Sequence, residues 1–344
     1  MLKNLSKFIF LFTMVLGTMI SISSNSWFGI WMGLEINLLS FIPLMINTNN
    51  LLSTEASLKY FLTQAFASSL LLFSMMLFIL FFNLNFNLNM YSFYNLFIFI
   101  PLLIKSGIPP FHFWFPNVME GINWMSSLML LTWQKIAPLL IISYLMLNNS
   151  VMIIIIMIST FIGALNGLNQ SSLRKIMAFS SINHLGWMLA SMMFNENLWM
   201  IYFILYTFIS FSIIYLFNHF KLFFINQLYS FFFNSFIMKN FFLISFLSMA
   251  GLPPFLGFLP KWLVIQSLIL MNMNFLLVWM IFMSLITMYF YLRICYSSLM
   301  LNYSEIIFNN LFLMKNQLYL MIISFNFITV SGLMMFIYLI FYFY

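Results

Sequence analysis

The sequence predicts an all-α polytopic membrane protein with about 11 transmembrane helices, because one crossing takes about 20 apolar residues in a helix. Hydrophobic residues make up 64% of the 344 residues and charged residues only 5%, whereas a soluble domain has about 25% charged residues. Apolar runs of spanning length follow one another along almost the whole chain. The motif G-x-P-P-F-x-x-x-x-P occurs twice, at Gly107–Pro116 and Gly251–Pro260, each time inside such a run.

The apolar runs define the predicted spans in chain order. They are Phe8–Ile22, Trp27–Ile46, Leu58–Phe82, Ser92–Phe115, Ile122–Leu147, Val151–Leu168, Arg174–Phe194, Leu198–Phe220, Phe241–Leu270, Phe275–Met300 and Leu318–Phe343. The first span follows Lys3 and Lys7, as the apolar part of a signal peptide does. No small-residue cleavage site comes after it and the next span starts almost at once, so we count it as a true span.

The positions of the basic residues support this count. If the spans alternate in direction, nine of the twelve Lys and Arg residues lie on or near one side of the membrane. They are Lys3, Lys7, Lys59, Arg174, Lys175, Lys221, Lys239, Arg293 and Lys315. The opposite connections, such as Asn83–Tyr91, carry no Lys or Arg. The positive-inside rule therefore predicts the N-terminus on the inner, matrix-like side and the C-terminus outside.

Each of the two repeated motifs is expected to break its helix. A Pro-Pro pair removes two backbone donors and clashes with the preceding turn. The residues of the predicted breaks are Gly107, Pro109, Pro110, Gly251, Pro253 and Pro254. The breaks fall in the fourth and ninth spans, which run in opposite directions, and matching breaks in two halves of a membrane chain point to a transport site.

This pattern predicts two inverted five-helix repeats, each with one discontinuous helix. We expect the first repeat at 1–147, with its broken helix near 92–121. The second is expected at 148–300, with its broken helix near 241–270, and one further helix at 301–344.

Anchoring at the membrane surface does not explain four charged residues: Glu35, Lys105, Lys135 and Lys261. Glu35 lies near the midplane of its span, about nine residues in at about 1.5 Å per residue. Each such charge costs about 2.5–3.5 kcal/mol on insertion scales, so together they indicate a hydrated, protein-lined interior. Burial disfavours the charged form of both residue types, which suits proton relay. The structural alternative is that Lys105 and Lys261 reach the interface by snorkelling.

Other polar residues extend the list of relay candidates. His184, with Ser180 and Ser181 one turn away, either continues a water-filled path or forms a hydrogen bond between helices. His112 lies within the first break, where it either caps a freed carbonyl or passes a proton.

Cofactor, metal and nucleic-acid chemistry finds little support in the sequence. The histidines have no metal-ligand spacing, and a single cysteine, Cys295, provides neither a disulfide nor an iron–sulfur ligand set. The sequence contains no G-x-G-x-x-G, P-loop or G-x-S-x-G motif. The net charge of +7 comes from scattered residues, so it does not predict nucleic-acid binding. We therefore expect no metal and no cofactor in this chain.

Six stretches carry a similarity to a known family. They are Ser24–Met45, Ser53–Ala65, Pro109–Gly121, Thr132–Leu139, Gly167–Leu189 and Gly251–Gln266. They resemble subunit 2 of mitochondrial NADH:ubiquinone oxidoreductase (respiratory complex I), one of its antiporter-like, proton-translocating subunits. The absence of Asp and the abundance of Phe, Met and Asn look like the product of an AT-rich genome such as an insect mitochondrion.

The resemblance implies a membrane-arm subunit of the proton-translocating NADH:ubiquinone reductase in the mitochondrial inner membrane. The N-terminus would then lie on the matrix side and the C-terminus on the intermembrane-space side. FMN, iron–sulfur clusters, NADH and ubiquinone are expected in other subunits, and no redox chemistry in this one. The implied partners are other membrane-arm subunits, including antiporter-like neighbours, and phospholipids such as cardiolipin. The charged residues of the family fall, by motif, on Glu35, Lys105, Lys135 and Lys261.

Three alternatives remain open from the sequence. A stand-alone secondary transporter that exchanges a cation for protons would use the same buried lysines. A structural subunit would hold its neighbours together and keep its charges as relics. A quinone-binding or haem-binding redox subunit is disfavoured, because the histidines lack the paired spacing of membrane haem sites.

Overall fold

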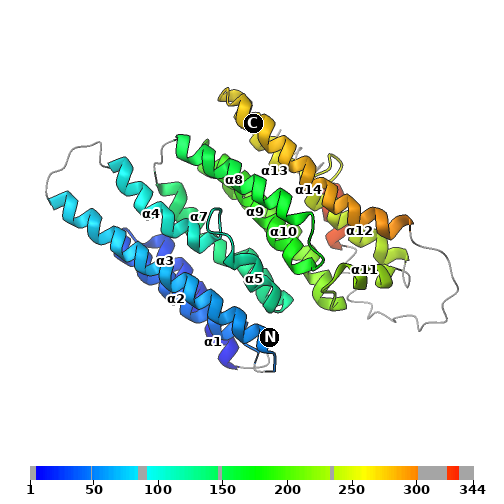
Figure 1. Ribbon diagram of the computed structural model, residues 1–344, viewed down its shortest axis with the longest axis horizontal. Helices are drawn as coiled ribbons and strands as arrows, with labels where there is room; N and C mark the ends of the chain where they lie inside the picture. The colour runs from blue at the N-terminus through cyan, green and yellow to red at the C-terminus, as the bar shows by residue number, and fades with distance from the viewer. Residues whose placement is uncertain are drawn as a thin grey trace. The chain divides into compact units, whose positions relative to one another are not determined.

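The computed structural model describes residues 5–47, 49–83, 91–145, 149–232, 236–300 and 324–332, and nearly all of these residues are helical (Figure 1). The prediction of an all-α protein is confirmed. Within the described ranges, β pairing is confined to one isolated bridge between Ser172 and Phe224. The chain divides into two compact units, one ending at Ile155 and the other beginning at Ile156.

Within its described residues, the first unit contains seven helices and the start of an eighth. They are α1 (Leu5–Ser23), α2 (Trp27–Met45), α3 (Leu51–Asn83), α4 (Tyr91–Ser106), α5 (Trp114–Gly121), α6 (Trp124–Leu131), α7 (Trp133–Tyr144) and the beginning of α8 (Asn149–Gly167). The second unit contains the rest of α8 and the helices that follow. They are α9 (Leu173–Met192), α10 (Glu196–Phe220), α11 (Ile225–Phe232), α12 (Phe236–Ala250), α13 (Phe258–Leu270), α14 (Asn274–Met300) and a helical segment at 324–332.

Among the described residues, seven segments are long and apolar enough to cross a membrane by length and composition. They are Ser6–Ser23, Trp27–Met45, Leu51–Leu80, Trp124–Tyr144, Ser150–Gly167, Glu196–Phe220 and Asn274–Tyr296. Of the other four predicted spans, the fourth and ninth are interrupted, and the seventh, α9, is too polar to count. The eleventh lies outside the described residues except for 324–332. The number of spans therefore stays a prediction.

The predicted fifth span is not one continuous helix. Its helices α6 and α7 meet at Thr132, whose hydroxyl donates to the Leu128 carbonyl at 2.8 Å. Pro138 lies inside α7 and has no N–H to donate to the Gln134 carbonyl. Because the proline ring also clashes with that carbonyl, a helix bends about one turn before a proline. Hydropathy identifies this span but does not indicate that its helix is interrupted at Thr132.

The short helix α11 was not predicted, because its eight residues lie in a segment that we interpreted as a connection. Lys221 ends α10 in the left-handed conformation, with φ of 53°. The chain then pairs with the connection between α8 and α9: Phe223 accepts a hydrogen bond from the Leu173 N–H at 2.9 Å. The Ile225 N–H donates to the Ser171 carbonyl at 3.1 Å. Two distant connections of the second unit are thus held together.

Helix α9 is the most polar of the long helices and is also the most deeply buried. All of its residues from Ile176 to Ser191 are buried. A Cβ added to Gly163 of α8 would lie 2.6 Å from the Asn183 nitrogen, and one added to Gly186 would lie 2.5 Å from the Ser159 hydroxyl oxygen. The backbone of α8 therefore packs directly on α9. Polar side chains on a membrane helix are tolerated where protein surrounds them.

Helices α1 and α2 pack against each other through glycines, and Figure 1 shows them side by side with α3. A Cβ on Gly33 would lie 2.5 Å from the Ser21 nitrogen, and one on Gly17 would lie 2.8 Å from the Asn37 nitrogen. Small residues let membrane helices approach closely, where packing replaces the hydrophobic effect as the attraction. This contact sets the position of α2, which carries Glu35.

The variant Gly33→Ala is expected to destabilise the protein by about 1–3 kcal/mol, as overpacking does. At a helix position without close neighbours the same change would stabilise the protein, because alanine has a higher helix propensity than glycine. The measurement is the melting temperature of the purified protein in detergent, with Ser69→Ala at an exposed position of α3 as the control. A melting temperature equal to that of the control would contradict the close packing of α1 on α2.

Candidate functional site

The first break begins where α4 ends at Ser106. Gly107 follows with φ of 73°, in the left-handed region that favours glycine. Its N–H donates to the Ile104 carbonyl at 3.2 Å, and the next N–H, of Ile108, donates to the Leu103 carbonyl at 3.0 Å. This pair of bonds is a Schellman cap, which satisfies carbonyls at the end of a helix.

The second break has the same local structure. Helix α12 ends at Ala250, and Gly251 follows with φ of 81°. The Gly251 N–H donates to the Ser248 carbonyl at 3.1 Å, and the Leu252 N–H donates to the Leu247 carbonyl at 3.4 Å. Both G-x-P-P-F motifs therefore end a helix with the same left-handed glycine and the same two capping bonds.

The match continues through the turn that follows each cap. The Phe111 N–H donates to the Ile108 carbonyl at 3.1 Å, and the Phe255 N–H donates to the Leu252 carbonyl at 3.0 Å. The residues enclosed by these turns are the paired prolines Pro109, Pro110, Pro253 and Pro254. Since proline has no N–H, it leaves no donor unsatisfied in an apolar environment.

Lys105 lies in the last turn of α4, directly before the first break, and only 7% of its surface is exposed. Its backbone carbonyl accepts a hydrogen bond from the Gln64 side chain at 3.3 Å. The Trp114 indole N–H donates to the Ile104 carbonyl at 3.0 Å. Side chains of α3 and α5 therefore complete the capping of α4 and enclose Lys105 in protein.

Glu35 is half-buried in α2, in the neighbourhood of Lys105 and Tyr60, and it forms no ion pair with Lys105. Around it runs a network of polar side chains that the sequence did not single out. The Tyr60 hydroxyl bonds to the Gln134 amide oxygen at 3.4 Å, and the Gln134 amide nitrogen donates to the Asn37 side chain at 2.9 Å. The sequence did contain a signal for two of these residues. Asn37 lies two positions after Glu35, and Gln134 is adjacent to Lys135, which is buried.

Lys135 is 1% exposed and lies in the first turn of α7, directly after the kink at Thr132. Its ammonium nitrogen is 5.0 Å from the centre of the Phe115 ring, within cation–π range. A Cβ on Gly107 would lie 3.3 Å from Phe115. Phe115 therefore connects the first break to Lys135, and the structure brings Glu35, Lys105 and Lys135 into the same compact unit.

Lys261 is 5% exposed and belongs to the second unit. Its ammonium donates to the Ala250 carbonyl at 2.8 Å, across the break from α13 to the end of α12. A Cβ on Gly251 would lie 2.8 Å from the same nitrogen. A cation is stabilised at the C-terminal end of a helix dipole, so Lys261 has a favourable partner inside the protein.

His184 lies in a buried cluster of hydroxyl groups. Its Nδ1 is 2.9 Å from the Tyr202 hydroxyl, and its ring centre is 5.2 Å from that of Tyr206. Ser181 lies near Tyr206, and Ser180 lies near Tyr291. The structure therefore unites the three predicted residues of α9 with three tyrosines from α10 and α14. The i, i+4 spacing of Tyr202 and Tyr206 was the available signal for two of them.

His112 lies within the first break and is 3% exposed. Its ring is close to that of Phe113, with 4.3 Å between the centres, and it interacts with the Pro110 backbone. Among the described residues, no three His, Cys, Asp or Glu side chains are grouped closely enough to hold a metal ion.

Comparisons with known proteins bear on the whole chain. The family model described as NADH:quinone oxidoreductase/Mrp antiporter, TM, matches residues 24–287. NADH-ubiquinone oxidoreductase chain 2 of Anopheles gambiae is 55% identical over 336 residues, which cover 97% of this chain and 98% of that protein. The protein of the same name from Aedes aegypti is 56% identical over 334 residues, covering 97% of each.

Solved structures show the same fold. A chain of respiratory complex I from Thermus thermophilus, with bound aureothin, aligns with a TM-score of 0.83 and 20% identity, over 95% of this chain and 78% of that one. A chain of the Mrp complex from Dietzia aligns with a TM-score of 0.73 and 17% identity, over 86% of this chain and 60% of that one. From the family model and the insect relatives together, the chain belongs to the NADH-ubiquinone oxidoreductase chain 2 family, the antiporter-like membrane subunits of mitochondrial complex I.

Proposed function

We propose that this antiporter-like complex I subunit translocates protons across the mitochondrial inner membrane, driven by quinone reduction elsewhere in the complex. The observation that carries the proposal is the burial of a lysine at each of the two matching helix breaks, Lys105 before the first and Lys261 after the second. Buried lysines are rare and expensive in membrane helices and are typical of ion and proton pathways.

In the first unit, Glu35 is the partner that sets the proton affinity of Lys105. A charged Glu35 favours the charged lysine, and loss or displacement of that charge favours release of the proton. Quinone reduction is proposed to act on this pair by changing charge or hydration nearby. Lys135 then receives the proton, and the polar side chains of Tyr60 and Gln134 support its passage.

In the second unit, the proton passes from the His184 cluster to Lys261. A hydroxyl both donates and accepts hydrogen bonds, and neutral imidazole does the same through its two nitrogens. The His184–Tyr202 contact, with Ser180, Ser181 and Tyr206 beside it, therefore suits transfer. Water is expected to link these groups in the membrane plane.

The finer topology also belongs to this proposal. We infer eleven spans, with inverted repeats at 1–147 and 148–300 and one helix at 301–344. The N-terminus is placed in the matrix and the C-terminus in the intermembrane space. Support comes from the identical caps and turns of the two breaks and from the one-sided distribution of basic residues. FMN, iron–sulfur clusters, NADH and ubiquinone are assigned to other subunits, and contacts are expected with antiporter-like neighbours and with lipids such as cardiolipin.

Family membership bears on one of the alternatives that the sequence left open, the stand-alone exchanger, but not on the structural subunit. Membership in the chain 2 family favours a complex I subunit over a stand-alone cation exchanger. A purely structural subunit would bury the same lysines, so that alternative has to be separated by measuring proton transport.

The variant Glu35→Gln is expected to lower proton pumping severalfold while assembled complex I is retained, because it removes the charge that acts on Lys105 but keeps the shape. Pumping is measured in proteoliposomes as the pH change per NADH oxidised. The control is Glu55→Gln, in an exposed pair with Lys59 at 2.6 Å. Equal pumping by the two variants would contradict the role of Glu35.

The variant Lys135→Met keeps the length and apolar stem of the lysine but removes its titratable group. Proton pumping is expected to fall by about 100-fold or more, the scale on which a positioned proton-transfer group contributes. The same proteoliposome assay applies, with the content of assembled complex measured on native gels. Full pumping by a normally assembled Lys135→Met complex would favour the structural subunit.

The variant Tyr202→Phe keeps the buried ring and removes only the hydroxyl bound to His184. It is expected to slow pumping and to leave the amount of assembled complex nearly unchanged. Tyr289→Phe is the matched control, because Tyr289 is 61% exposed. If both variants pump like the unmodified protein, the His184 cluster is a structural contact between α9 and α10.

A further inference from the structure

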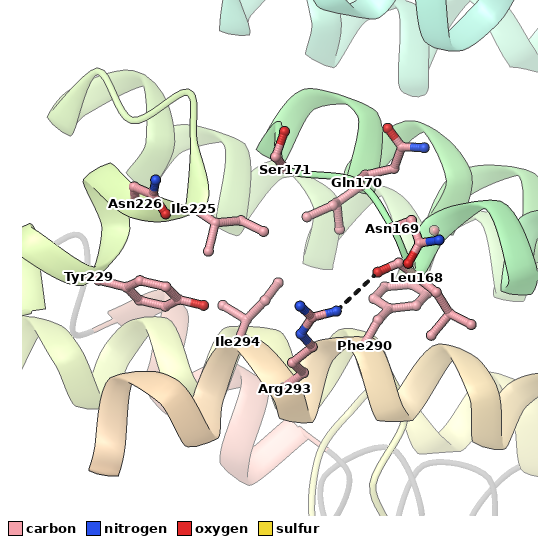
Figure 2. Close-up of a pocket in the computed structure, with 12 residues that line it drawn as sticks. Leu168, Asn169, Gln170, Ser171, Ile225, Asn226, Tyr229, Phe290, Arg293 and Ile294 are labelled. Carbon is pink, nitrogen blue, oxygen red and sulfur yellow. Dashed lines mark hydrogen bonds between the residues drawn. The ribbon is translucent and has the colours of Figure 1, made fainter. Parts of the chain in front are cut away.

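A pocket opens in the second unit where the connection after α8, the helix α11 and the last turns of α14 meet (Figure 2). Its volume of about 370 Å³ lies in the usual range for small-molecule sites, about 300–1,000 Å³. Polar side chains supply much of its lining: Asn169, Gln170, Ser171, Asn226, Tyr229 and Arg293. The mechanism proposed above uses none of them.

Among the lining residues that the structure describes, Arg293 is the one that carries a charge. It rises from α14 toward the end of α8, where its Nη1 donates to the Leu168 carbonyl at 3.4 Å, as Figure 2 shows. The guanidinium is exposed, and its planar fork of N–H donors matches the oxygens of a phosphate. Among the described residues that line the pocket there is no carboxylate, so this lining favours an anion over a cation.

Further donors surround the arginine. The side chains of Asn169, Ser171, Asn226 and Tyr229 make no hydrogen bond within the part of the chain that the structure describes. In Figure 2 the Tyr229 hydroxyl points toward Arg293. Amide and hydroxyl groups beside a guanidinium can complete the coordination of a phosphate group.

The pocket lies at the level where spans leave the bilayer. The spanning segments of α8 and α10 end at Gly167 and Phe220. Asn169 and Ser171 of the lining lie just beyond the first end, and Asn226 and Tyr229 follow the second. Arg293 lies about two turns before Met300, where α14 ends. Lys221 follows the end of α10 and Lys175 lies in the first turn of α9, on the side that the positive-inside rule assigns to the matrix.

The pocket also has an apolar wall, which includes Phe290 and Ile294 of α14. An inorganic anion has no apolar part to pack against such a wall. A lipid does, because its glycerol and first acyl carbons follow directly after its phosphate. Basic residues at a membrane surface attract anionic headgroups, each by about 1 kcal/mol.

We propose that this pocket binds the phosphate headgroup of an anionic phospholipid. The Arg293 guanidinium binds the phosphate, and the side chains of Asn226 and Tyr229 donate hydrogen bonds to its remaining oxygens. Phe290 and Ile294 contact the apolar part of the lipid. The bound lipid ties the connection after α8 to α11 and α14 at their membrane ends. The inference gives a site to the lipid contacts that belong to the function proposed above, and it stands apart from proton transfer because it uses other residues and another readout.

The test uses purified complex I in detergent and a phosphatidylglycerol analogue with a photoreactive diazirine on the first acyl carbons. Cross-linked peptides are mapped by mass spectrometry. Label is expected within 167–176, 225–229 and 290–294. The variant Arg293→Gln is expected to lower this labelling about tenfold, in line with loss of one charge-assisted interaction. Lys59→Gln, an exposed residue of the first unit, is the control and is expected to label normally.

Three results would overturn the proposal. One is unchanged labelling in Arg293→Gln. Another is equal labelling by the phosphatidylcholine analogue, which would mean a non-selective lipid groove. The third is loss of label on adding millimolar inorganic phosphate, which would mean a soluble-anion site. Should Arg293→Gln fail to assemble, Asn226→Leu at an exposed position replaces it, and unchanged labelling there contradicts the proposal equally.

Discussion

Two helices of this protein end inside an apolar environment, and the backbone carbonyls that they free must find donors within the protein. Lipid cannot supply such donors, and an unsatisfied backbone group costs several kcal/mol. At the end of α4 the donors come from the backbone of Gly107 and Ile108 and from the side chains of Gln64 and Trp114. At the end of α12 the donors come from the backbone of the second motif and from the Lys261 ammonium.

This requirement explains why charge gathers at the breaks. A lysine that reaches a helix end meets the negative end of its dipole, which offsets part of the cost of burial. Lys261 does so directly, whereas Lys105 belongs to the ending helix itself. The two units therefore place a lysine differently at the same kind of break. In the second unit the lysine crosses the break and donates to the backbone of the other helix, and in the first unit it lies in the last turn of the helix that ends there.

The polar interior in turn needs enclosure by protein. Helix α9 carries His184, Ser180 and Ser181, and α8 lies against it so closely that Gly163 and Gly186 have no room for a methyl group. In the first unit, Gly17 and Gly33 let the backbones of α1 and α2 approach each other equally closely. Close approach through glycine thus supplies the walls that keep charged and hydroxyl-bearing side chains away from lipid.

The sequence by itself determined the helical membrane class, most of the spans and the polar residues worth examining, because hydropathy and Pro-Pro breaks act locally. The sequence did not predict the kink at Thr132, the helix α11 or the contacts of Lys135. Tertiary structure alone decided which residues meet: Tyr60 and Gln134 near Glu35, Tyr202 and Tyr206 around His184, and Arg293 beside the end of α8. Such partners come from helices far apart in the chain, and their pairing depends on helix packing, which no local pattern encodes.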